Sequence, residues 1–332
     1  MQIFTGIEAF SQTPHRPLVL ALGNFDGVHA GHQKILRQTV QQAGALKAVS
    51  AALTFQQHPQ TVLRPELPPP GLILSPEYKL FLLEQLGMDV CLFLPFTPEF
   101  SKLEADFFVR DTLVQHLGMK KMCLGYNARF GRGRKGSPDL MRQISQQTPF
   151  DFEEIGPVEI RGEAVSSTRI RKLLAAGNLE EAAACLGRPF SVLGKVIPGD
   201  HRGQEMGFPT ANIEAPAGLQ MPFGVYPVRI REIKIQRKPL NPGQEDYQAS
   251  PAESIFEGVL NYGVRPTFGE NSKPLFEAFL FNFKGDLYGK TLEIFFYPRL
   301  RAEGTFSGLE ALKKQISEDV QAAKRFFTKN RV

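Results

Sequence analysis

The hydrophobic pattern of this chain changes near residue 187, and the two parts indicate different folds. Before that point, short apolar runs alternate with segments of helical periodicity. The runs are PLVLALG (17–23), AVSAALTF (48–55), VCLFLPF (90–96), KMCLGY (121–126) and FDFEEIG (150–156). Such alternation predicts a parallel sheet with helices on both faces, whose ligands bind at the carboxyl ends of the strands. We therefore expect a doubly wound α/β domain over residues 1–186.

After residue 187, Gly and Pro separate a series of strand-like runs, which are FSVLGKVI, GVYPVRIREIKIQ, SIFEGVLNYG, PLFEAFLFNF and LEIFFYPRL. This spacing predicts an antiparallel barrel or sandwich. Apolar residues recur every three or four positions from Leu309 to Phe327, which predicts a closing helix. We expect this second domain to span residues 187–332, with the polar segment 239–254 as a mobile loop.

The composition is that of a soluble globular protein with two domains. The 332 residues are 42% hydrophobic and 22% charged, and the net charge of +5 suits an anionic substrate such as a nucleotide. The chain begins without a basic leader and an apolar stretch, and no apolar run approaches the roughly 18 residues of a membrane span. Its three cysteines, Cys91, Cys123 and Cys185, lie far apart among apolar residues, as is typical of buried thiols. We expect a cytoplasmic protein that is a monomer or a weak homo-oligomer.

The segment GNFDGVHAGH (23–32) joins the first apolar run to an amphipathic run, so it lies where a strand turns into a helix. The first N–H groups of a helix are unpaired and attract an anion, and phosphate is the natural ligand. His29 and His32 share one face of the first helical turn. Two imidazoles there can donate hydrogen bonds to a phosphoryl group as charge develops. A structural turn or a zinc site would be the alternative, although no third zinc ligand stands at a recognisable spacing.

A second segment, VSSTRIR (165–171), fits the other wall of a phosphate site. Ser166, Ser167 and Thr168 can cap a helix and present hydroxyl groups to phosphate. Arg171 can bind a triphosphate through two nitrogen atoms. An ordinary helix cap is the alternative interpretation.

The segment GFPTANI (207–213) is the strongest signal in the second part. Thr210 and Asn212 alternate onto one face of an extended segment, where a hydroxyl and an amide oxygen can bind Mg²⁺ beside the phosphates of ATP. The alternative is the plain start of a strand.

These segments are similar to the signatures of one bacterial family, the bifunctional riboflavin kinase/FAD synthetases. GNFDGVHAGH resembles the HxGH signature of nucleotidyltransferases in the form GxFDGxHxGHQ, and VSSTRIR resembles their ISSTxxR signature. GFPTAN resembles the riboflavin kinase signature, and the family's order is kept by RGQEMGFPTAN, GVYPVRI, GVRPTF, FKGDLYG and RLRAEGTFSGLEALKKQI. The resemblance covers nearly the whole chain. It implies a Rossmann-like nucleotidyltransferase domain followed by a small antiparallel β-barrel with a C-terminal helix.

The resemblance also implies two activities and a role for each matched residue. Riboflavin would be phosphorylated to FMN with ATP and Mg²⁺, and FMN would then be adenylylated to FAD. For the second step, it implies His29, His32 and Arg171 as catalytic residues and a binding site formed by Gly23, Phe25, Asp26, Gly27, Gly31, His58, Asn127, Ser166, Ser167 and Thr168. For the first step, it implies Glu277 as the base, a metal held by Thr210 and Asn212, and substrate contacts from Gly207, Phe208, Pro209 and Asn261.

Some family positions are occupied differently here. TFQQHPQ, which contains His58, resembles TFxPHP but has Gln57 for the usual Pro. GYNARFGRGRKG contains Asn127 and has Ala128 for the usual Phe. LFEAFLFNF contains Glu277 and resembles LEVHLxDF, with Phe279 for His and Asn282 for Asp. A family member with only one working site is therefore an alternative interpretation.

The segment GRGRKG (131–136) fits GxGxxG and raises two further alternatives. A dinucleotide site would place this motif after the first strand, whereas here it follows the fourth predicted strand. An RNA-binding protein would contact phosphates through Arg129, Arg132, Arg134 and Lys135. Aromatic residues are not interleaved with these cations, and acidic residues soon follow at 151–154, so we expect no nucleic-acid partner and no membrane partner.

Overall fold

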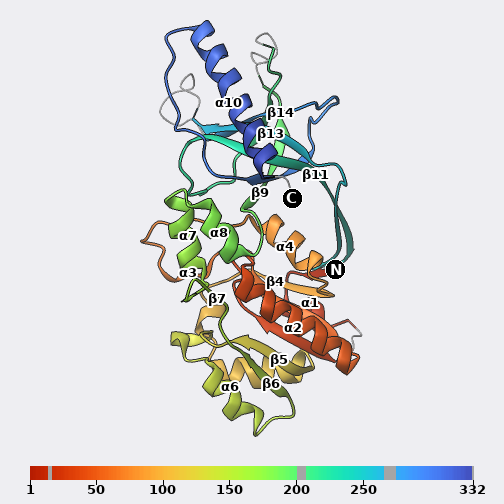
Figure 1. The fold of residues 1–332 in the computed structure, drawn as a ribbon. Coiled ribbons are helices and arrows are strands. Elements are labelled where there is room, and N and C mark those ends of the chain that lie inside the picture. The colour runs from red at the N-terminus through yellow and green to blue at the C-terminus, as the bar shows by residue number, and fades with distance from the viewer. Residues whose placement is uncertain (14–16, 200–206, 265–273, 331–332) are drawn as a thin grey trace. The chain divides into compact units, whose positions relative to one another are not determined.

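The computed structural model describes residues 1–13, 17–199, 207–264 and 274–330 (Figure 1). The chain divides into two compact units. The first contains Met1–Ser167 and Ile235–Ala249, and the second contains Thr168–Lys234 and Ser250–Val332. Residues from the second half of the sequence therefore belong to the first unit. The expected domain boundary after residue 186 stays a prediction.

The first unit is built on the predicted parallel sheet. Its parallel strands, in spatial order, are β1 (Gln2–Phe4), β4 (Val90–Leu94), β3 (Val49–Phe55), β2 (Leu18–Leu22), β5 (Met119–Gly125) and β6 (Asp151–Ile155). All five predicted runs are strands. The three-residue strand β1 was not predicted, because a segment this short has no distinct periodicity.

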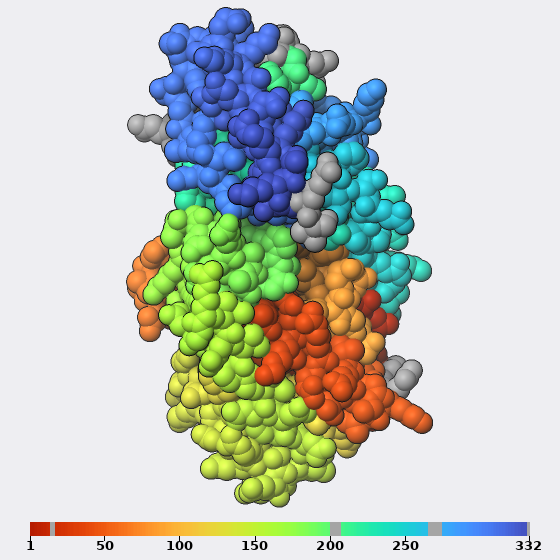
Figure 2. Space-filling view, viewed as in Figure 1, coloured from red at the N-terminus to blue at the C-terminus, as the bar shows by residue number. Residues whose placement is uncertain are grey.

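Helices connect these strands, and polar side chains cap the N-termini of several of these helices. Ser75 caps α4 (Pro76–Gln85) by accepting the Tyr78 N–H at 3.2 Å, and Ser137 caps α6 (Pro138–Ser145) in the same way. The other helical segments of this part are α1 (Ile7–Ser11), α2 (Ala30–Leu46), α3 (Pro59–Leu63), α5 (Ala105–Phe107), a π-helix (Phe108–His116) and 3₁₀ turns at Phe100–Lys102 and Arg132–Arg134. One side of α2, red-orange in Figure 2, forms part of the molecular surface.

The strand order places a switch point beside β2. The chain runs from β2 to β3 and β4 on one side and then returns to β5 on the other side of β2. Ligands of such sheets bind where the direction of strand order reverses, at the carboxyl ends of the strands. The segments that leave β2 and β5 at that point are GNFDGVHAGH and the turn that contains Asn127.

The prediction of a mobile loop at 239–254 is wrong. β11 (Gly224–Asn241) continues through part of this segment, and β12 (Gln244–Pro251) follows after a tight turn at Gly243. β12 pairs antiparallel with β1, with Gln2 opposite Asp246. The hairpin needs few apolar residues because most of its side chains are exposed and only positions such as Tyr247 and Ala249 are buried. Because of this polar composition, the sequence did not predict the end of β11 or the strand β12.

The second unit contains the antiparallel barrel. Within the described residues, six strands close in the order β13 (Phe256–Gly263), β14 (Leu275–Leu280), β10 (Ala211–Glu214), β9 (Ser191–Ile197), β15 (Thr291–Phe296) and β11, which pairs back to β13. The helices of this unit are α7 (Ser167–Ala175), whose first residue belongs to the first unit, α8 (Leu179–Leu186) and α10 (Leu309–Lys329). This confirms the predicted fold class, a doubly wound domain followed by a small barrel with a C-terminal helix.

The predicted apolar stripe of α10 covers one outer face of the barrel. Val320, Ala323 and Phe327 are buried and pack in one cluster with Val225 and Val259. The first predicted member of the stripe, Leu309, is 63% exposed. Of the helices in the described part of the chain, none is long and apolar enough to cross a bilayer.

Candidate functional sites

The segment Gly23–His32, here called the histidine loop, joins β2 to α2 in an unusual backbone conformation. Phe25, Gly27 and Val28 have φ angles of 49°, 86° and 37°. Positive φ is rare for a β-branched residue such as Val28 and persists only where the surroundings enforce it. The Val28 N–H donates to the Phe25 carbonyl at 3.1 Å, and the Gln33 amide donates to the Val28 carbonyl at 2.9 Å. These hydrogen bonds help to hold the loop in this conformation.

The two histidines of this loop lie against each other. His29 precedes α2 and its Nδ1 accepts the backbone N–H of His32 at 3.3 Å. In a neutral His29 ring the proton is then on Nε2, which can act as a donor. The two rings stack with centroids 3.6 Å apart, and Phe25 contacts the edge of the pair at 5.3 Å from His32. The two predicted histidines therefore form a stacked pair.

His32 is held in its neutral form. Burial, the neighbouring His29 and the charge of Lys79 lower the pKa of His32 well below the ordinary value of 6.5. Its buried Nδ1 has no hydrogen-bond partner among the described residues. A neutral imidazole can donate a hydrogen bond without bringing a permanent charge into the site.

The VSSTRIR segment meets the histidine loop. The Ser167 hydroxyl, at the start of α7, donates to the carbonyl of Asp26 at 2.8 Å, although 141 residues separate them. The Asp26 carboxylate in turn accepts the Ile73 N–H at 3.2 Å. Thus the two signatures that sequence analysis paired are joined directly. Arg171 lies one helical turn after Ser167 on the same side of α7.

The other predicted members lie at the starts of helices, in a turn or at the ends of the loop. Ser166 is half-buried and Thr168 is exposed at the start of α7. His58 begins α3 and its Nδ1 accepts the Gln60 N–H at 3.2 Å. Asn127 is exposed in the turn after β5, the strand that flanks β2. Gly23 and Gly31 lie at the two ends of the histidine loop. A Cβ atom at position 31 would lie 3.3 Å from the His29 ring.

Sequence analysis missed Lys79, which lies behind the histidine loop. It is on α4 and only 7% exposed, and burial lowers its pKa to about 8. Its Nζ donates to the carbonyl of Phe55 at 2.8 Å, to the carbonyl of Asn24 at 3.1 Å and to the hydroxyl of Thr54 at 3.3 Å. The only signal in the sequence is a lysine inside the apolar run YKLFLL, which would pass as an exposed helical position.

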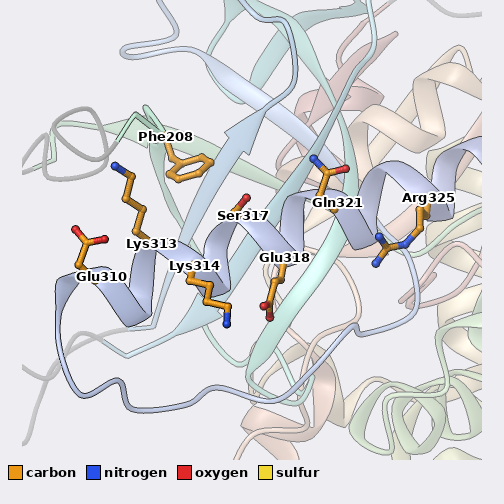
Figure 3. Close-up of a pocket in the computed structure, with 8 residues that line it drawn as sticks. All are labelled: Phe208, Glu310, Lys313, Lys314, Ser317, Glu318, Gln321 and Arg325. Atoms are coloured by element: carbon orange, nitrogen blue, oxygen red, sulfur yellow. The ribbon is translucent and has the colours of Figure 1, made fainter.

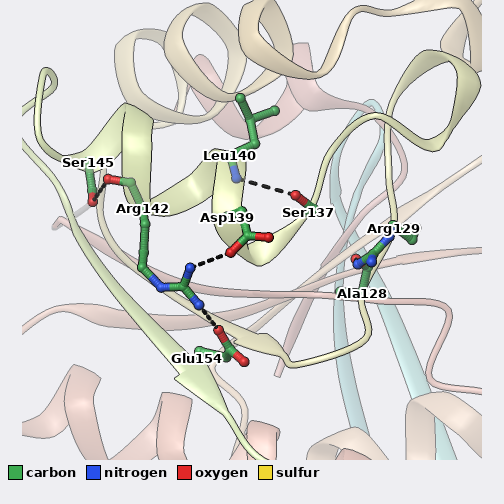
Figure 4. Close-up of polar contacts among 8 residues, drawn as sticks. All are labelled: Ala128, Arg129, Ser137, Asp139, Leu140, Arg142, Ser145 and Glu154. Atoms are coloured by element: carbon green, nitrogen blue, oxygen red, sulfur yellow. Dashed lines mark hydrogen bonds and ion pairs between the residues drawn. The ribbon is translucent and has the colours of Figure 1, made fainter.

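The GxGxxG segment has a structural explanation. A Cβ at Gly131, where φ is 67°, would lie 2.8 Å from Ala105, and one at Gly136 would lie 2.5 Å from the ring of Phe130. The glycines therefore permit close packing, of Gly131 against α5 and of Gly136 against Phe130. Figure 4 shows α6 after this loop, where Arg142 pairs with Asp139 and Glu154. Arg132 also has an acidic partner, Glu104, at 3.1 Å. The dinucleotide interpretation loses its basis.

In the second unit, strand register aligns three predicted residues. Glu277 on β14 stands opposite Asn212 on β10 and opposite Asn261 on β13. Directly opposed residues of neighbouring strands point to the same face of a sheet, so the three side chains form one row. Asn212 is 8% exposed, and the other two are half-buried. Residues from three separate motifs thus meet through backbone pairing.

The segment Gly207–Thr210 separates two cavities. Phe208 lines a pocket of about 520 Å³ along α10, together with Lys313, Ser317 and Gln321 (Figure 3). Pro209 and Thr210 line another cavity of about 320 Å³ with the segment Phe283–Tyr288. Phe208 also contacts the edge of Phe279 with ring centroids 5.4 Å apart. Adjacent residues of one signature therefore face different spaces.

The predicted metal ligands suit a hard cation. Thr210 lines the smaller cavity and Asn212 lies two residues further on, in the row with Glu277. Hydroxyl and amide oxygens near a carboxylate are a donor set for Mg²⁺ rather than for zinc. Within the described part of the chain, no three His, Cys, Asp or Glu side chains gather to hold a metal ion. The zinc alternative for His29 and His32 gains no support.

Comparisons with known proteins match this arrangement. A family model described as FAD synthetase matches residues 11–169, and one described as riboflavin kinase matches residues 186–327. Bifunctional riboflavin kinase/FMN adenylyltransferases are similar along almost the whole chain. The protein of Haemophilus influenzae is 35% identical over 308 residues, covering 93% of this chain and 94% of its own length. That of Escherichia coli K12 is 34% identical over 328 residues and covers 98% of both chains.

The chain belongs to the bifunctional riboflavin kinase/FMN adenylyltransferase family. This confirms the resemblance stated from the motifs. Among solved structures, one described as a macrolide-efflux protein from Streptococcus pneumoniae is 27% identical, with a TM-score of 0.76 and 99% of both chains covered. From that likeness we take the fold. The motifs GVRPTF and RGQEMGFPTAN fall partly in 265–273 and 200–206, outside the described residues.

Proposed function

We propose that this member of the family carries out both reactions, at two separate sites. The barrel phosphorylates riboflavin to FMN with ATP, and the histidine loop serves the transfer of AMP from ATP to FMN. The observation that supports this division most strongly is the Ser167–Asp26 hydrogen bond, which joins the two nucleotidyltransferase signatures through residues of the first unit, whereas the kinase row lies in the second. Departures such as Phe279 and Ala128 then alter flavin contacts without removing either reaction.

In adenylyl transfer, a phosphate oxygen of FMN attacks the α-phosphorus of ATP, and pyrophosphate leaves. No protein nucleophile is needed, because positioning and electrostatic stabilisation suffice for such displacements. Nε2–H of His29 and the neutral ring of His32 donate hydrogen bonds to the phosphoryl oxygens as charge builds. Arg171 binds the triphosphate through its guanidinium group. The first N–H groups of α2 and the hydroxyl of Ser166 or Thr168 complete the anion site.

In phosphoryl transfer, the ribityl 5′-hydroxyl of riboflavin attacks the γ-phosphorus of ATP, and ADP leaves. Glu277 accepts the hydroxyl proton, as a carboxylate commonly does in this reaction. We place the phosphates of ATP in the cavity lined by Thr210 and the flavin ring in the pocket beside Phe208. Phe208 contacts Phe279, two residues after Glu277 on β14, and Ala278 of the same strand lines the other cavity. The ribityl chain would then reach from the pocket to the phosphates beside this strand.

Thr210 and Asn212 would hold Mg²⁺, which neutralises phosphate charge when bound. Asn261, at the other end of the row, would contact the flavin. The relevant partners are small molecules, and we propose a monomer or weak homo-oligomer in the cytoplasm. Cys91, Cys123 and Cys185 are all buried, and buried thiols fit a reducing compartment.

The deciding experiment follows riboflavin, FMN and FAD by chromatography after the purified chain is mixed with riboflavin, ATP and Mg²⁺. We expect FMN first and FAD later, and no FMN when a chelator is added. A second mixture supplies FMN in place of riboflavin. If the first mixture forms FMN but neither mixture forms FAD, only the kinase activity is supported. No product in either mixture would refute the proposal.

A further inference from the structure

The ammonium group of Lys79 has a partner for each of its three protons. Its Nζ donates to two backbone carbonyls, of Asn24 and Phe55, and to the Thr54 hydroxyl, all within 3.3 Å. A lysine ammonium has three N–H donors and no acceptor, so this set fits its donor capacity. The Phe93 ring lies 5.5 Å away on β4 and completes the enclosure. The head group is therefore held in one place.

These partners belong to two segments that meet at the nucleotide end of the sheet. Asn24 is in the histidine loop that leaves β2, and Phe55 is the last residue of β3, three residues before His58. Thr54 reinforces the link, since its hydroxyl donates to the same Asn24 carbonyl at 3.0 Å. Lys79 thus connects α4 to both segments.

A buried charge at this position has a cost. Burial lowers the pKa of Lys79 to about 8, which means that keeping the ammonium charged at neutral pH costs free energy. An apolar side chain of similar length would avoid that cost, but it would leave the carbonyl groups of Asn24 and Phe55 without this donor. The charge does affect the histidine pair, because it contributes to the low pKa of His32.

We propose that Lys79 is a positioning residue, which holds the histidine loop in the geometry required for adenylyl transfer. This inference rests on the proposed function of that loop. A shift of about 1 Å in groups that orient a reaction can reduce the rate about 100-fold. The effect should fall on turnover rather than on substrate affinity, since Lys79 lies behind the loop and donates to its backbone.

The test is Lys79→Met in the full chain, with both half-reactions measured separately. We expect kcat for FAD formation from FMN to fall about 100-fold, with much smaller changes in KM for ATP and FMN. FMN formation from riboflavin should be unchanged and serves as an internal check on folding. Lys120→Met is the matched control, because Lys120 is exposed on β5 of the same sheet.

Thr54→Val provides a second, independent measurement. It removes the hydroxyl that links Lys79 to Asn24 and should lower the same kcat by a smaller factor. The double variant should lose less than the product of the two single losses, because both act through one carbonyl. This pattern distinguishes positioning from a general loss of stability, even where Lys79→Met alone folds poorly.

Three results would overturn the inference. Lys79→Met could form FAD at the wild-type rate, both activities could fall equally, or the Lys79 and Thr54 losses could multiply. A wild-type chain that forms no FAD from FMN would refute the proposed function itself, and the role of Lys79 with it. Retained FAD formation in Lys79→Met would refute the role of Lys79 alone.

Discussion

The two proposed sites are built by different means. The adenylyltransferase site uses a continuous stretch, Gly23–His32. Other segments donate hydrogen bonds to this stretch through Thr54, Ile73, Lys79 and Ser167. The kinase site uses Asn212, Asn261 and Glu277, which come from three strands and are brought into one row by backbone pairing. A loop can be displaced by changes outside the site, whereas a strand row is lost mainly when its own side chains change. The two activities should therefore respond differently to mutation.

The largest separation of the two sites is expected from replacing both His29 and His32 with Ala. In the proposed mechanism each imidazole donates to developing charge, and loss of one such donor typically reduces a rate about 100- to 1000-fold. FAD formation from FMN should become undetectable, while FMN formation remains near the wild-type rate. His116→Ala, at an exposed histidine of the same unit, is the control. A parallel loss of FMN formation would contradict the division into two sites.

The reverse separation is expected from Glu277→Gln. Without a proton acceptor, FMN formation should slow about 100- to 10,000-fold. FAD formation from supplied FMN should continue, since Glu277 belongs to the barrel. Glu253→Gln, at an exposed carboxylate between β12 and β13, should leave both rates unchanged. Normal FMN formation in Glu277→Gln would show that another group takes the proton.

A more moderate effect is expected from Phe208→Ala, which tests whether the two substrates of the kinase occupy different cavities. The change removes one aromatic wall of the pocket along α10 but leaves Thr210 in place. KM for riboflavin should rise about tenfold, as for loss of one aromatic contact, with little change in KM for ATP. Phe107→Ala, at an exposed phenylalanine, is the control. Equal increases in both constants would place the two substrates in one cavity.

The smallest effect concerns the pH dependence of stability in the histidine loop. In the unfolded chain His32 has the ordinary histidine pKa of 6.5, whereas in the folded chain burial lowers its pKa well below that value. Between these values the unfolded state binds more protons, so the free energy of unfolding falls as the pH falls. Acidification from about pH 7.5 to about 5.5, across the ordinary histidine pKa, should lower the melting temperature less in His32→Gln than in wild type. Equal decreases would mean that His32 titrates normally in the fold.

Patterns confined to a short stretch were predictable from the sequence. The strand–loop–helix unit around His29 and the parallel sheet follow from apolar runs and glycine positions, because local periodicity determines them. The alignment of Glu277 with Asn212 could not be derived this way, since it depends on strand register over 65 positions of sequence. Family resemblance supplied Glu277, whereas Asn212 was predicted from the pattern of its own segment. Lys79 was missed because its function depends on carbonyl groups, which carry no signal in the sequence.

The hairpin of β11 and β12 has a consequence for dividing the protein. A polypeptide that ended at residue 186 would lack β12, so the backbone groups that β1 shares with Gln244, Glu245 and Asp246 would be unpaired. Uncovered strand edges readily add strands from other molecules, and Ile3 and Phe4 are apolar. We therefore expect such a fragment to self-associate. Truncation at one position cannot yield the complete adenylyltransferase sheet, because the strand that pairs with β1 lies more than two hundred residues further along the chain.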